Sequence, residues 1–126
     1  MPALKEKAIT LLGSNAAVNF NAAAAYAIFT VPPGKVARVT HVIVRDTTGS
    51  LAACTSIKFG TYFNADASQH AALATITGAT HWVSLINTTN PCIEVASAVA
   101  FNCTVAATLA GGTVVATVEA FGYLTN

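Results

Sequence analysis

Charged residues are scarce in this sequence. Asp, Glu, Lys and Arg make up 9% of the 126 residues, against roughly 25% in an ordinary globular domain. The formal net charge is +1, and the basic residues form no cluster. A nucleic-acid-binding surface needs such a cluster to neutralise phosphates. We therefore expect neither a nucleic acid nor another polyphosphate as a partner.

Long hydrophobic runs are also missing. A membrane-spanning helix needs about 20 consecutive apolar residues. The segment at residues 1–20 contains two lysines, and Ser14, Asn15 and Asn19 interrupt its apolar stretch. The sequence therefore predicts neither a signal peptide nor a membrane span.

Cysteine and histidine are few and widely spaced. Cys54, Cys92 and Cys103 are odd in number and lack metal-type spacing. They predict reduced, mostly buried thiols in a protein made in a cytoplasm. The three histidines lack the close spacing that sets two imidazoles on one metal, and we read His41 as a hydrogen-bonded strand residue. We expect no metal and no cofactor.

The remaining polar residues give little support for a catalytic site. Asp46, Asp66, Glu94 and Glu119 could meet as a carboxylate pair for glycoside hydrolysis, but nothing in their spacing requires it. Solvated acids at turns and sheet edges are the favoured interpretation. A nucleophilic cysteine would need a basic neighbour, and Cys103 alternates with apolar residues. We expect a protein that is not an enzyme. A small hydrolase is the alternative, and it predicts a deep pocket with converging polar groups.

Strand patterns separated by turn residues fill most of the chain. We expect strands at 8–12, 26–31, 35–45, 55–61, 80–86, 99–107 and 113–124, with a helical turn or a loop at 21–25. The Gly111-Gly112 pair predicts a hairpin between the last two strands. About eight strands with turns every 8 to 12 residues, roughly, indicate an all-β chain. The predicted fold is an antiparallel β-sandwich, a jelly roll of about eight strands.

One domain is expected for a chain of this length. We divide it into an N-terminal arm with a first short strand, residues 1–25, and a jelly-roll body, residues 26–126. Lys5 and Lys7 in the arm could grip a partner protein or simply belong to a solvated terminus.

The strand at 35–45 is apolar on both sides. Strict alternation places Val36, Val42 and Val44 on one face and Val39 and Ile43 on the other. An antiparallel sheet normally exposes one face to water. We therefore expect Val36, Val42 and Val44 to be covered by a neighbouring subunit or by a loop.

Aromatic residues near polar loops form a further candidate surface. Tyr62, Phe63 and Trp82 could stack on sugar rings, as aromatic residues do in many jelly-roll lectins. For Trp82 we favour a place in the core or in a subunit interface.

Three segments, in their order along the chain, resemble those of a known group of proteins. FTVPPGKVARVTHVIVRD, SIKFGTYFNADAS and TVEAFGYLTN together resemble small jelly-roll virion proteins of tailed bacteriophages, the head decoration or cement proteins and related short tail modules. The resemblance covers roughly residues 26–124 and includes no catalytic signature.

This resemblance implies a homotrimer that binds the major capsid protein on the assembled head and stabilises it. The protein would then lie on the capsid surface of the virion after synthesis in the host cytoplasm. A tail-associated carbohydrate- or host-binding module is the alternative. The candidate subunit or capsid interface comprises Lys5, Lys7, Val36, Val42, Val44, Tyr62, Phe63 and Trp82.

Overall fold

A computed structural model describes residues 9–49, 56–61, 72–73, 81–84, 92–107 and 114–126. These residues form nine strands: β1 (Thr10–Asn19), β2 (Ala24–Thr30), β3 (Val36–Arg45), β4 (Ser56–Gly60), β5 (Ala72–Leu73), β6 (His81–Ser84), β7 (Ile93–Val95), β8 (Ala100–Ala107) and β9 (Val115–Thr125). All strand pairs are antiparallel. The prediction of an all-β chain with antiparallel sheets is confirmed.

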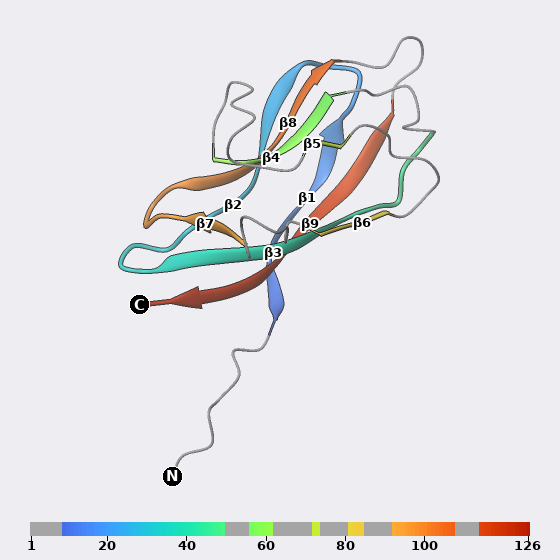
Figure 1. The fold of residues 1–126 in the computed structure, drawn as a ribbon. Coiled ribbons are helices and arrows are strands. Elements are labelled where there is room, and N and C mark those ends of the chain that lie inside the picture. The colour runs from blue at the N-terminus through green and yellow to red at the C-terminus, as the bar shows by residue number, and fades with distance from the viewer. Residues whose placement is uncertain (1–8, 50–55, 62–71, 74–80, 85–91, 108–113) are drawn as a thin grey trace.

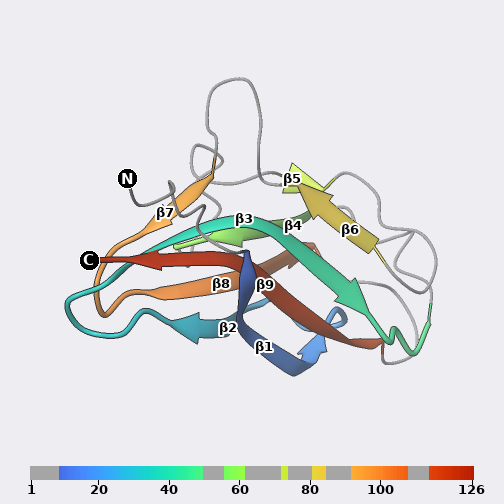
Figure 2. The ribbon, with the colours of Figure 1, turned by 90° about the horizontal axis from the view of Figure 1, so that it is seen from below.

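The strands form two sheets (Figure 1). The first sheet has the order β1-β9-β3-β6, and β7 pairs with the same strand β3. The second sheet has the order β2-β8-β4-β5. On one edge of β3, β7 pairs with residues 37–39 and β6 pairs with residues 41–44. Figure 2 shows β3 and β9 running side by side through the first sheet.

One hydrophobic core joins the two sheets. The first sheet contributes buried Val and Ala side chains from β1, β3 and β9, and the second contributes Ile28, Ile57, Phe59 and Phe101. Phe29 stacks on Phe101, with ring centroids 5.7 Å apart. The core side chains are apolar and closely spaced, so their burial is the main stabilising contribution to the fold.

A β-bulge at Thr40 divides β3 into two halves of opposite phase. The register with β9 pairs Val39 with Gly122 and His41 with Phe121, so Thr40 has no partner of its own. Ala37 and Val39 point inward before the bulge, and Val42 and Val44 point inward after it. The extra residue therefore keeps apolar side chains of both halves in the core.

Gly122 makes this bulge possible. A Cβ atom built at Gly122 would lie 1.9 Å from the Arg38 carbonyl oxygen and 3.0 Å from the Val39 Cα. The backbones of β3 and β9 thus approach closely opposite the bulge, and only a residue without a side chain fits there.

Two details of the expected layout differ from the structure. The first strand is longer than expected, because β1 has ten residues; it pairs with β9 and places Val18 in the core. Strands β8 and β9 do not form a hairpin, because they lie in different sheets. Of the two alternatives for residues 21–25, a helical turn or a loop, residues 21–23 are not helical, and Ala24 and Ala25 belong to β2.

Candidate interaction surface

The side chains that point away from the core on the first sheet form its outer face. Paired residues of neighbouring strands share a face, so the register defines this set. It comprises Leu11, Val36, Arg38, His41, Ile43, Arg45, Thr117, Glu119, Phe121 and Tyr123. The inward positions of β9 between them are the small residues Ala116, Val118, Ala120 and Gly122.

An apolar row crosses the centre of the outer face. Leu11 of β1 pairs with Phe121 of β9, and Phe121 pairs with His41 of β3. The rings of His41 and Phe121 are stacked, with centroids 4.9 Å apart and an interplanar angle of 3°. Leu11 is 51% exposed, and Ile9 just before it is 48% exposed. Together with the stacked rings, these side chains make the centre of the outer face the most apolar described part of the surface of the first sheet, and hence its candidate for contact with another protein.

His41 is partly buried within this row. Its Nδ1 lies 3.1 Å from the Thr40 hydroxyl oxygen, which agrees with the expectation of a hydrogen-bonded strand residue. Burial lowers the pKa of His41 from its ordinary value, because removal from water disfavours the charged imidazolium.

One end of the outer face has an ion pair centred on Arg38. The Arg38 guanidinium lies 2.7 Å from a Glu94 carboxylate oxygen on β7. The Arg38 pKa is raised by its hydrogen bond with Cys92 and by the charge of Glu94. Lys35 precedes β3 at the same end, and its ammonium donates a hydrogen bond to Asn126.

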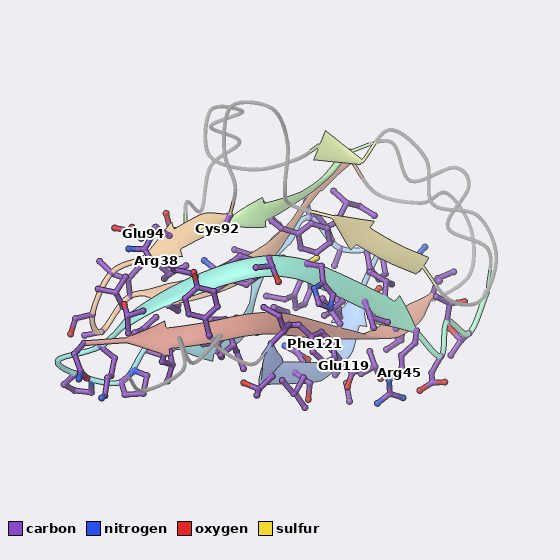
Figure 3. The ribbon with its side chains drawn as sticks, turned by 60° about the horizontal axis from the view of Figure 1, so that its bottom comes forward. Arg38, Arg45, Cys92, Glu94, Glu119 and Phe121 are labelled. Atoms are coloured by element: carbon purple, nitrogen blue, oxygen red, sulfur yellow. The ribbon has the colours of Figure 1, made fainter. Side chains whose placement is uncertain are left out.

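The opposite end has a second ion pair centred on Arg45. The Arg45 Nε donates to Glu119 Oε1 over 2.7 Å, and the guanidinium also pairs with Asp46. These contacts raise the Arg45 pKa, with the Glu119 hydrogen bond as the largest cause. Figure 3 shows Arg38 and Glu94 at one end, Arg45 and Glu119 at the other, and Phe121 between them.

The Asp and Glu side chains of the described residues all take part in these ion pairs. Glu119 and Asp46 both bind the Arg45 guanidinium, whereas Glu94 binds Arg38 at the far end of the face. Glu94 and Glu119 therefore do not meet as a catalytic carboxylate pair. Within the described ranges, no three His, Cys, Asp or Glu residues are grouped so that they could hold a metal ion.

The outer face of the second sheet has a different composition. Its outward positions on β2 and β8 include Ala25, Ala27, Thr30, Ala100 and Asn102, whereas Thr104, on the same side of β8, is buried. These side chains are small and uncharged. On β4, Lys58 pairs with Thr104 and so shares this side of the second sheet in the register. Among the described outward positions, those of the first sheet combine large apolar residues with ion pairs, so the first sheet is the better candidate for contact with another protein.

The structure separates the predicted interface residues. Val42 and Val44 have no exposed surface and belong to the core, so the prediction that they contact another subunit is wrong. The bulge at Thr40 turns both of them inward. Val36 lies partly exposed on the outer face, paired with Thr125. It is one of two predicted contacts whose positions in the strand register lie on this face.

The second is Trp82 in β6, which pairs with Ile43 and so shares its side of the sheet in the register. Lys5, Lys7, Tyr62 and Phe63 lie outside the described residues, as does Cys54. Cys103 is buried, as its alternation with apolar residues predicts.

Several residues of the outer face were missed from the sequence. Phe121 and Tyr123 continue the odd-numbered positions of Thr117 and Glu119, while all even positions from Ala116 to Gly122 are small. This alternation of small and large residues is the signal that identifies the outer side of β9.

The chain matches no protein-family model, no curated protein and no solved structure. The part of the chain that the structure describes contains no helix with the length and apolar character of a membrane span.

Proposed function

We propose that the chain is a jelly roll. A jelly roll arises when one long antiparallel hairpin of eight strands wraps into two sheets. Its nested pairs correspond here to β1 with β9, β2 with β8, β3 with β6, and β4 with β5, all of which are hydrogen-bonded. Wrapping adds the pairs β9 with β3 and β8 with β4. The short strand β7 is the only one of the nine described strands outside this scheme.

The function that we propose is that of a bacteriophage virion structural protein, a decoration or cement protein that binds the assembled head as a homotrimer. The order of the strands in the two sheets, which we interpret as a jelly roll, is the observation on which this proposal mainly rests. The resemblance of residues 26–124 to such virion proteins, and an outer face suited to contact with another protein, point the same way.

The proposed mechanism is stabilisation through binding. A protein that binds the assembled shell and not its separated subunits stabilises the shell by RT ln(1 + [L]/Kd) per site. In a trimer, the first contact with the shell raises the effective concentration of the other two binding sites. Weak individual contacts with the major capsid protein would then suffice for stable attachment.

Counting copies on purified particles tests this proposal. We expect the chain in a fixed and high ratio to the major capsid protein, as measured by quantitative mass spectrometry. Particles stripped of the chain should release their genome at a lower temperature, and adding back the purified chain should restore the original temperature. A handful of copies at the tail would instead favour the carbohydrate- or host-binding module. Absence from particles would contradict both.

A further inference from the structure

We draw no further inference here: the strongest candidate, the apolar patch that the exposed side chains of Ile9 and Leu11 form at the edge strand β1 of the first sheet, carries none because nothing in the described part of the structure shows what covers it.

Discussion

The two sides of the first sheet differ sharply although the same strands form them. From Ala37 to Val44 and from Ala116 to Gly122, the inner side of β3 and β9 consists of Val, Ala and Gly residues that are fully or almost fully buried. The outer side has aromatic rings, His41 and two arginines in ion pairs. Small residues allow the two sheets to pack closely, while the outer side has room for long side chains. The difference indicates that the inner side determines folding and the outer side is available for recognition.

The largest expected effect comes from placing the same charge on each side of β3. Val44→Lys puts an ammonium among core residues that are all apolar, which should cost about 3 kcal/mol or more of unfolding free energy. Ile43→Lys, one residue earlier, lies on the outer side opposite Glu119. It should change stability by less than about 1 kcal/mol. Urea denaturation followed by circular dichroism measures both variants.

Equal losses of stability in the two variants would contradict the assignment of sides. Loss of stability at Ile43 but not at Val44 would show that the bulge at Thr40 does not shift the phase of β3. The comparison therefore tests the bulge as well as the core.

Gly122→Ala should have the next largest effect. Its new methyl group would overlap the Arg38 carbonyl, a backbone group that cannot rotate away, so β3 and β9 must separate locally. We expect a loss of about 1–3 kcal/mol, the usual cost of overpacking. Gly34→Asn is the control, because no atom lies near its missing Cβ and Asn tolerates the positive φ of 80°. If both variants melt at the wild-type temperature, the close approach at the bulge is not a constraint on the fold.

The ion pairs at the two ends of the outer face should differ in how much each stabilises the fold, and this difference is a smaller effect. Arg45→Met removes the partner of Glu119, whose side chain is only 14% exposed, and leaves a carboxylate without its ion pair. Arg38→Met removes the partner of Glu94, which is 59% exposed and is solvated by water when unpaired. We expect a greater decrease in melting temperature for Arg45→Met than for Arg38→Met. The reverse order would mean that the contact of Arg38 with Cys92 and Glu94 is the more important one.

Much of the strand layout could be predicted from local pattern. The expected segments 26–31, 35–45, 55–61 and 99–107 each overlap an observed strand, because alternation and turn residues are local signals. The buried Cys103 follows from the same alternation.

The bulge and the pairing of distant strands could not be predicted in this way. Both sides of residues 42–44 are apolar, and strict alternation predicts that Val42 and Val44 lie on the same face as Val36. The structure differs because the bulge adds an extra residue at Thr40, and an alternating pattern does not include such a residue. The Gly111-Gly112 pair favoured a hairpin, but β8 and β9 belong to different sheets. Which sheet a strand joins depends on contacts across the whole chain, so the candidate surface became recognisable only once β1, β9 and β3 lay side by side.

The smallest expected effect is a pH dependence that arises at His41. Burial lowers the pKa of His41 in the folded chain below the ordinary value of 6.5, so the unfolded chain binds more protons between the two values. The unfolding free energy therefore rises with pH in this window. The contribution of His41 is fully present above about pH 6.5 and is lost as the pH falls toward the folded-state pKa.

Comparing wild type with His41→Gln isolates this contribution from those of the other histidines. Wild-type protein should lose more unfolding free energy than the variant between pH 8 and pH 5, roughly the range over which an ordinary histidine titrates. Equal losses would show that His41 is not the titrating group.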